Sequence, residues 1–253
     1  VAGHDHLGHG KSLPEGGTPV YFGDGNTWNT VVDDIYVLHQ RLKQRYPDVP
    51  LCIMGHSMGS FLTRTYLIRY PGTVKAAVIM GTGWQPQAAI TGGLALANAI
   101  AAVSGENATS ELVTELAFGS YNKLFAPNRT KVDWLSADES NVDDYIADPL
   151  CGADATVGLF RQMLHGIRFN QRQSHLRQMD REMPVLFVAG DKDPVGSCGK
   201  GVRQTYDAFR AAGMRDCTLK LYPGLRHEIL NEKAYTADIT KNIEAWLLSR
   251  LEK

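Results

Sequence analysis

Ser57 stands in the pentapeptide Gly55-His56-Ser57-Met58-Gly59, which joins a short apolar run to an amphipathic one. This G-x-S-x-G pattern is typical of a tight turn between a strand and a helix, where flanking glycines leave room and the serine hydroxyl projects outward. Such a hydroxyl attacks a carbonyl carbon when a neighbouring base removes its proton. The helix that follows would point its first N–H groups at the developing oxyanion, so we assign one oxyanion-hole donor to Met58.

Two later loops offer the base and the acid that such a serine needs. His227 lies in the segment PGLRHE, and Asp191 and Asp193 lie in the segment GDKDP. Each segment follows an apolar run, and in a sheet with a serine turn of this kind the acid and the base follow in the order Ser, Asp, His. We therefore predict that Ser57 is the nucleophile and His227 the general base. Asp193 is predicted to orient the imidazole, and Asp191 is the alternative acid.

These motifs together resemble the α/β-hydrolase superfamily. Within it, the closer resemblance is to the monoacylglycerol lipase and lysophospholipase-like serine hydrolases, which are sometimes classed with the serine aminopeptidases. The resemblance rests on GHSMG, GDKDP and PGLRHE, on the opening HDHLGHGKS, which is similar to the family turn D-x-x-G-H-G-x-S, and on DPLCG at 148–152. It covers essentially the whole chain. In that family the acid occupies the last position of G-x-x-D, which favours Asp193 over Asp191.

The resemblance implies a serine hydrolase that cleaves a carboxylic ester of a lipid-like substrate, a monoacylglycerol or a lysophospholipid, through an acyl-enzyme on Ser57. It implies neither a metal ion nor an organic cofactor. A short-chain carboxylesterase or an aminopeptidase on the same triad is the alternative within enzymes. Acidic side chains near the pocket would then bind a free amine, and the candidates are Asp143, Asp144 and Asp148. A ligand-binding homologue that keeps the triad without turnover is the alternative from another class.

Short apolar runs and longer amphipathic stretches alternate along the chain, which predicts an α/β fold with a mostly parallel sheet flanked by helices. The predicted strands end at Gly or Pro and cover residues 51–54, 75–80, 185–189 and 218–222. Amphipathic helices are predicted around 31–42, 61–68 and 235–247. The loops after the strands would meet at the C-terminal edge of the sheet, where such folds place their sites.

About a hundred residues separate the second predicted strand from the third, far more than a helical crossover needs. Because this interval has helical patterns of its own around 86–104, 109–124 and 154–169, we predict a helical cap, or lid, inserted at 82–180. Residues 1–81 and 181–253 would form the α/β-hydrolase core.

The beginning of the chain departs from the family pattern. It starts at Val1 and enters the HDHLGHGKS segment at once. The serine hydrolases that this chain resembles carry strands and a His-Gly loop before this turn, and that loop donates one oxyanion-hole N–H. We therefore expect an N-terminally incomplete sequence or a partner segment elsewhere, with the second oxyanion donor upstream of Val1.

His4, His6 and His9 have an alternative interpretation as ligands of a binuclear metallohydrolase. The expected Asp before the third histidine is missing, and no later His/Asp set is obviously paired with them. A structural loop near the nucleophile is the favoured interpretation, and no metal site is predicted.

Composition limits the partners. With 26 Lys+Arg against 27 Asp+Glu and no basic block, the chain has no electrostatic footprint for nucleic acid. The four cysteines form no C-x-x-C spacing, so we expect a protein with reduced thiols in the cytoplasm. Cys52 is expected in the core. We expect no membrane span, since the longest apolar stretch, 88–103, contains Thr, Gly and Asn. Under a lid this stretch could instead line an acyl-chain pocket or contact a lipid interface. The oligomeric state is left open.

Overall fold

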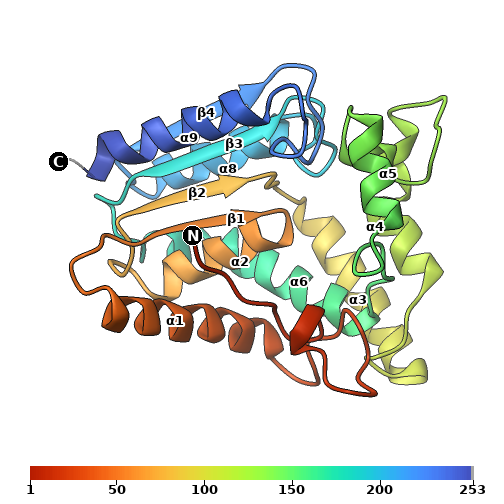
Figure 1. The fold of residues 1–253 in the computed structure, drawn as a ribbon. Helices are drawn as coiled ribbons and strands as arrows, with labels where there is room; N and C mark the ends of the chain where they lie inside the picture. The colour runs from red at the N-terminus through yellow and green to blue at the C-terminus, as the bar shows by residue number, and fades with distance from the viewer. Residues whose placement is uncertain (252–253) are drawn as a thin grey trace.

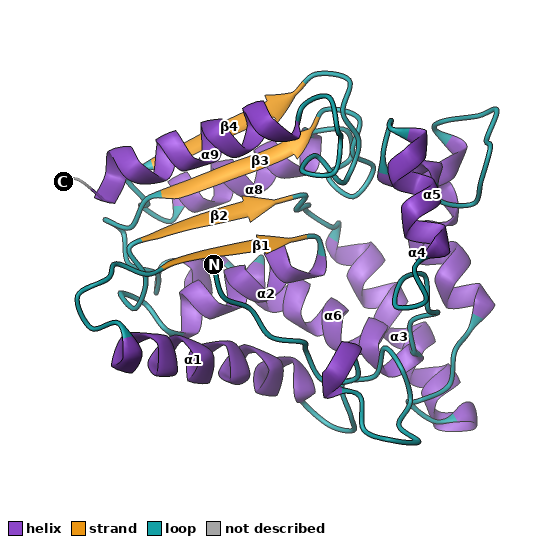
Figure 2. Ribbon diagram, in the orientation of Figure 1, coloured by secondary structure: helices purple, strands orange, loops and turns teal. Residues whose placement is uncertain are grey.

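The computed structural model describes residues 1–251 and contains a sheet of four parallel strands (Figures 1 and 2). The strands lie side by side in chain order and are β1 (Cys52–His56), β2 (Ala76–Met80), β3 (Val185–Gly190) and β4 (Cys217–Tyr222). All four coincide with predicted strands to within about two residues. The α/β fold predicted from the alternation of patterns is therefore confirmed.

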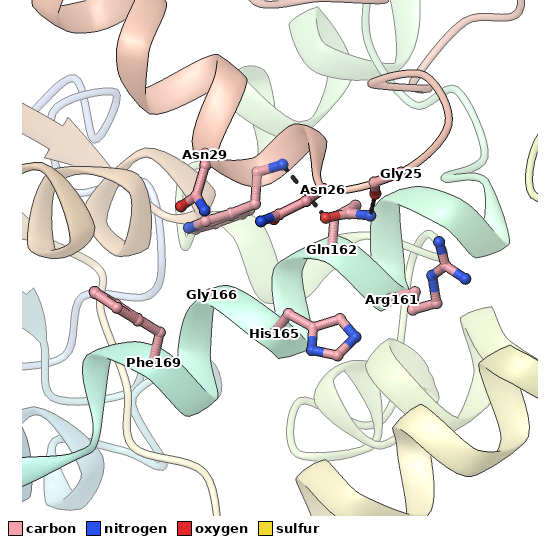
Figure 3. A pocket seen from close by; sticks show the side chains of 9 residues that line it. Gly25, Asn26, Asn29, Arg161, Gln162, His165, Gly166 and Phe169 are labelled. Atoms are coloured by element: carbon pink, nitrogen blue, oxygen red, sulfur yellow. Dashed lines mark hydrogen bonds between the residues drawn. The ribbon is translucent and has the colours of Figure 1, made fainter.

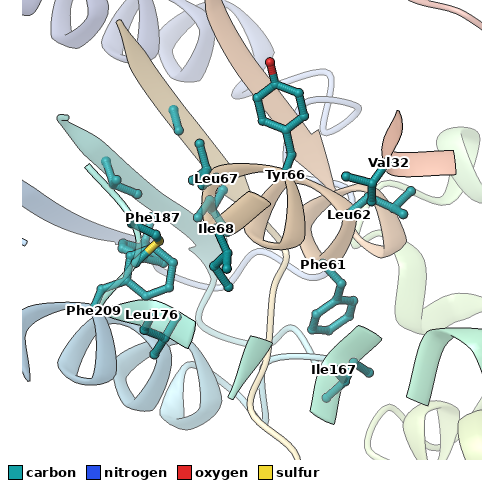
Figure 4. Close-up of a cluster of buried hydrophobic side chains, with 14 of the residues drawn as sticks. Val32, Phe61, Leu62, Tyr66, Leu67, Ile68, Ile167, Leu176, Phe187 and Phe209 are labelled. Atoms are coloured by element: carbon teal, nitrogen blue, oxygen red, sulfur yellow. The ribbon is translucent and has the colours of Figure 1, made fainter. Parts of the chain in front are cut away.

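Helices cover both faces of this sheet. α9 (Thr236–Leu251) lies on one face, and α1 (Thr27–Arg45), α2 (Met58–Arg69) and α8 (Lys200–Ala211) lie on the other (Figure 1). Successive residues of a strand point to opposite faces. Val78 and Val188 accordingly pack in the cluster under α9, whereas Ile79 and Phe187 pack in the larger cluster on the α2 side (Figure 4). A strand buried on both faces reads as a continuous apolar run, which explains why β2 and β3 are conspicuous in the sequence.

β1 differs from its neighbours because it lies at an edge of the sheet and, within residues 1–251, pairs only with β2. Met54 is 55% exposed, and Cys52 is exposed as well. The expectation that Cys52 belongs to the core is therefore wrong. An apolar run predicts a strand, but it does not tell whether another element covers its outer side.

Six helical elements connect β2 to β3. They are α3 (Gln87–Ser104), α4 (Glu111–Lys123), η2 (Asp133–Leu135), α5 (Glu139–Ala147), α6 (Val157–Asn170) and α7 (Gln173–Leu176). α4 and α5 stand beyond the C-terminal ends of the strands, on the side to which the strand arrows point in Figure 1. α6 and α7, in contrast, contribute Leu159, Ile167 and Leu176 to the main core beside α2. The division into a core and a cap at 82–180 stays a prediction.

α3 is long and apolar enough to meet the length and composition of a membrane span, contrary to the expectation from the sequence. It packs one face on α6, where Ile90, Leu94 and Ala97 are buried, and leaves most of its surface exposed. The Gly and Asn residues that interrupt this helix do not remove its apolar character as a whole.

Candidate active site

Ser57 occupies the turn between β1 and α2 with φ 54° and ψ −122°, a strained conformation for a residue other than glycine. Its N–H donates to the Met80 carbonyl oxygen at 3.1 Å, which fastens the turn to the end of β2. A side chain on Gly55 would collide with the Gly59 carbonyl oxygen and with Thr63. A Cβ on Gly59 would meet nothing within 4 Å, so only the first of the two glycines is required for space.

His227 and Asp193 meet at the ends of β4 and β3. The imidazole donates its Nδ1–H to Asp193 Oδ1 at 3.0 Å, and the two residues are 2% and 0% exposed. The same carboxylate oxygen accepts the Val195 N–H at 2.9 Å, which holds it in place. With Nδ1 bonded to a carboxylate, His227 is left with Nε2 to accept a proton.

Asp191, the alternative acid, forms a hydrogen bond with the backbone and not with His227. Its Oδ1 accepts the Gly224 N–H at 2.8 Å and thereby joins the two loops that follow β3 and β4. The two carboxylates therefore have different partners: Asp193 bonds to the side chain of His227, and Asp191 bonds to the backbone N–H of Gly224.

His56, the residue before the serine, also contacts His227. Its Nε2–H donates to the His227 carbonyl oxygen at 3.0 Å, and the two ring centroids are 4.5 Å apart. Burial lowers the pKa of His56 to about 4, with a smaller contribution from His227 in the same direction. A Cβ on Gly81 would lie 3.0–3.1 Å from atoms of both imidazole rings. His56 is thus a neutral donor that supports the His227 backbone.

Aromatic side chains from the predicted cap cover His227. The indole of Trp134, in η2, lies with its centroid 5.2 Å from the imidazole of His227, and Tyr121 of α4 contacts that indole edge-on at 5.2 Å. Burial, followed by the nearby charge of Asp193, raises the pKa of Tyr121 to about 12, so its phenol stays protonated. Neither aromatic residue stands in a local motif, so their position over His227 was not predicted from the sequence.

Met58 is the first residue of α2, and its N–H belongs to the helical turn whose N–H groups have no acceptor within the helix. The N-terminal end of α2 carries partial positive charge and lies directly beside Ser57. This position suits the predicted oxyanion donor, whose role stays a prediction.

Comparison with known proteins places the chain in a family. Residues 1–234 match the family model described as serine aminopeptidase, S33. The chain belongs to the serine aminopeptidase S33 family of α/β-hydrolases. A monoacylglycerol lipase of Mycolicibacterium smegmatis is 31% identical over 252 residues, an alignment that spans 98% of this chain and 77% of the relative.

Two further relatives extend this result. The mouse monoglyceride lipase is 27% identical over 258 residues, which span 99% of this chain and 74% of the relative. The crystal structure of a thermostable carboxyl esterase from Bacillus coagulans in complex with glycerol superposes with a TM-score of 0.89 at 25% identity. That superposition covers 97% of this chain and 79% of the esterase. The resemblance inferred from GHSMG, GDKDP and PGLRHE is therefore confirmed at the level of family and fold.

The three N-terminal histidines of this S33 hydrolase do not converge. His4 and His6 contact each other edge-on at 5.0 Å, whereas His9 bonds through Nδ1 to the Leu7 carbonyl oxygen at 2.8 Å. Burial, and then the neighbouring histidines His4 and His9, lower the pKa of His6 to about 4. Residues 1–251 contain no group of three or more His, Cys, Asp or Glu side chains placed to hold a metal ion.

The acidic residues considered for binding a free amine are engaged elsewhere. Asp143 pairs with Arg129 at 2.6 Å, and Asp144 pairs with Lys233 at 3.4 Å. Asp148 accepts the Leu150 N–H at 2.8 Å. All three lie on or just after α5, and two have cationic partners of their own, so they do not form an open anionic cluster.

A pocket of about 490 Å³ lies between the start of α1 and α6 (Figure 3). Gln162 closes one side by donating to the Gly25 carbonyl oxygen and accepting the Trp28 N–H at 3.3 Å. Arg161, at the rim, pairs with Glu106. The pocket shares no residue with the predicted triad.

Proposed function

We propose that this S33 hydrolase cleaves the carboxylic ester of a monoacylglycerol or a lysophospholipid through an acyl-enzyme on Ser57. The observation that carries the proposal is the buried Asp193–His227 pair beside the strained turn that presents Ser57. The monoacylglycerol lipase and monoglyceride lipase relatives and the carboxyl esterase neighbour support a hydrolase that acts on esters.

In the proposed mechanism, His227 Nε2 takes the proton of Ser57 Oγ as the oxygen attacks the ester carbonyl carbon. The Met58 N–H and a second donor stabilise the tetrahedral oxyanion, and Asp193 stabilises the imidazolium through its bond to Nδ1. The imidazolium then gives its proton to the departing alcohol, which leaves the acyl group on Ser57. A water molecule, deprotonated by His227, attacks this ester and releases the carboxylic acid and the serine.

Two features support an ester of glycerol with an acyl chain as the substrate. The Bacillus coagulans esterase was crystallised with glycerol, the alcohol that a monoacylglycerol releases. The cap also exposes large apolar side chains, among them Val103, Leu112 and Leu116 at 89%, 54% and 66%. An exposed apolar surface of this kind supports peripheral contact with a lipid interface, from which a lipid substrate would be drawn.

A short-chain carboxylesterase is the alternative, favoured by the esterase neighbour. An aminopeptidase is less favoured because Asp143 and Asp144 already pair with cations. We also propose a cytoplasmic location, which the free thiols of all four cysteines support.

Intact-mass analysis after treatment with a fluorophosphonate tests the nucleophile. We expect one adduct on the parent protein and none on Ser57→Ala. For the acid, Asp193→Asn should lower ester turnover by about four orders of magnitude, whereas Asp191→Asn should retain most activity because an amide oxygen can still accept the Gly224 N–H. Full labelling of Ser57→Ala, or a larger loss in Asp191→Asn than in Asp193→Asn, would overturn these assignments.

A second assay tests the substrate. Initial rates on monoacylglycerols of increasing acyl length, a lysophospholipid and an aminoacyl-nitroanilide should be highest for the long-chain monoacylglycerols or the lysophospholipid. Highest rates on the shortest esters would favour the carboxylesterase. Labelling of Ser57 without turnover of any of these compounds would favour a ligand-binding protein.

A further inference from the structure

The loop that carries His227 is bonded to one segment of the cap on both sides of the histidine. Before it, Arg226 donates from Nη1 to the carbonyl oxygens of Asp133 and Ser136, the latter at 2.9 Å. After it, the Glu228 N–H donates to the Leu135 carbonyl oxygen at 2.8 Å. These bonds tie the position of the segment 133–138, which we call the clasp, to the position of the loop that carries His227.

Glu232 is a buried residue that also bonds to the clasp. Its side chain is only 3% exposed, and each of its two carboxylate oxygens accepts one backbone N–H of the clasp. Oε1 accepts that of Ala137 at 2.8 Å, and Oε2 accepts that of Asp138 at 3.1 Å. A buried carboxylate bonded to backbone N–H groups is costly to displace, because these groups would lose their partners together.

Trp134 lies within the clasp, between the residues that Arg226 and Glu232 hold. Its N–H donates to Asn122 Oδ1 at 3.0 Å, and its indole rests 5.2 Å from the imidazole of His227. Ala137 follows Trp134 by three residues. The hydrogen bond between Glu232 and the Ala137 N–H therefore restricts how far the indole can move away from His227. The indole of Trp134 therefore restricts the movement of the His227 imidazole, in addition to the restriction from the bond to Asp193.

We propose that Glu232 is a positioning residue for the hydrolysis. It holds the clasp so that Trp134 covers His227 and keeps the imidazole aligned between Asp193 and Ser57. The inference rests on the function proposed above, because it assigns a role only if His227 activates Ser57. Displacements of about 1 Å in such a base reduce rates up to a hundredfold, so the effect belongs in the chemical step rather than in substrate binding.

The experiment measures the rate constant for acylation of Ser57 by a small fluorophosphonate, which does not depend on the lipid-binding surface. We expect Glu232→Gln and Trp134→Ala each to lower this rate constant about tenfold or more. Steady-state hydrolysis should show the loss in kcat with KM little changed. Trp134→Phe should keep most of the rate, because an aromatic ring still covers the imidazole. Glu182→Gln, an exposed carboxylate paired with Arg215, is the matched control.

The double variant Glu232→Gln/Trp134→Ala separates positioning from general destabilisation. If Glu232 acts through Trp134, the double variant should be no slower than the slower single variant. Multiplicative losses, or parent rates in Trp134→Ala, would overturn the proposal while Ser57 labelling of the parent leaves the proposed function intact. Absence of labelling in the parent would remove both.

Thermal unfolding of each variant guards against misfolding. Trp134→Ala leaves Glu232 and the backbone bonds of the clasp in place, so it remains informative if Glu232→Gln unfolds. Equal losses of rate in Trp134→Ala and Trp134→Phe would also contradict a role for the aromatic cover.

Discussion

His56 shows how a single buried side chain can support the backbone of the predicted base, His227. Its Nε2–H bond to the His227 carbonyl oxygen fixes the tautomer, and its burial keeps the ring neutral. Since the neutral form is required in the folded state, protonation must compete with folding.

The unfolding free energy should therefore depend on pH through this residue. The pKa of His56 is lowered to about 4 in the folded protein, against an ordinary value of 6.5. Between these values the unfolded chain binds a proton that the folded chain does not, so the stability contribution is complete above pH 6.5 and is lost as the pH falls towards 4.

Urea unfolding at intervals from pH 8 to pH 5 measures this dependence. We expect a slope of at most about 1.4 kcal/mol per pH unit for each such histidine. His56→Gln, whose amide can still donate to the His227 carbonyl oxygen, should reduce the slope. His6, whose pKa is also lowered to about 4, and His39 and His165, whose pKa values burial lowers, contribute to the rest of the slope. An unchanged slope in His56→Gln would contradict the assignment.

At the scale of elements, the turn between β1 and α2 depends unequally on its two glycines. A Cβ at position 55 would overlap the Gly59 carbonyl oxygen, whereas a Cβ at position 59 has open space. Gly55→Ala should therefore destabilise the protein by about 1–3 kcal/mol and reduce fluorophosphonate labelling, while Gly59→Ala should retain both. Thermal unfolding and intact-mass labelling of the two variants provide the comparison, and equal behaviour would refute it.

Local patterns predicted most of these elements, because a buried strand and a tight turn each leave a signature in a few adjacent residues. The same patterns are the basis on which the three residues of the proposed triad were chosen. α5 and α8 were not predicted, although Val202, Tyr206 and Phe209 have the spacing of a helix face that packs on the sheet. The cover of His227 by Trp134 could not be predicted. It depends on how the cap packs on the core, which short-range periodicity does not record.

At the scale of the whole molecule, two cores lie on opposite faces of one thin sheet, and Val103, Leu112 and Leu116 are among the large apolar side chains that remain exposed. Leu112 and Leu116 occupy one side of α4, four residues apart, and are more than half exposed. This surface is suited to partial burial in a lipid interface.

Replacing both residues, Leu112→Ser with Leu116→Ser, should weaken binding to phosphatidylcholine vesicles about tenfold or more, because each leucine contributes about 1.5–3 kcal/mol when fully buried. Vesicle co-sedimentation measures the binding. Hydrolysis of a short, soluble ester should be unaffected, as should vesicle binding of the control Val37→Ser on α1, which is 43% exposed. Equal vesicle binding by the parent and the double variant would exclude this surface as the contact.

The packing of α6 and α7 has a consequence for exchanging caps between relatives. A cut at 82 and 180 would remove Leu159, Ile167 and Leu176 from the main core and strip the cover from α2. A transplantable unit therefore begins after α3, which itself places Ile90 and Leu94 in the main core, and ends before α6. A donor cap must also bring its own backbone N–H groups to Glu232. Chimeras designed on this shorter module would keep the core of the recipient intact and change only the surface that faces the substrate.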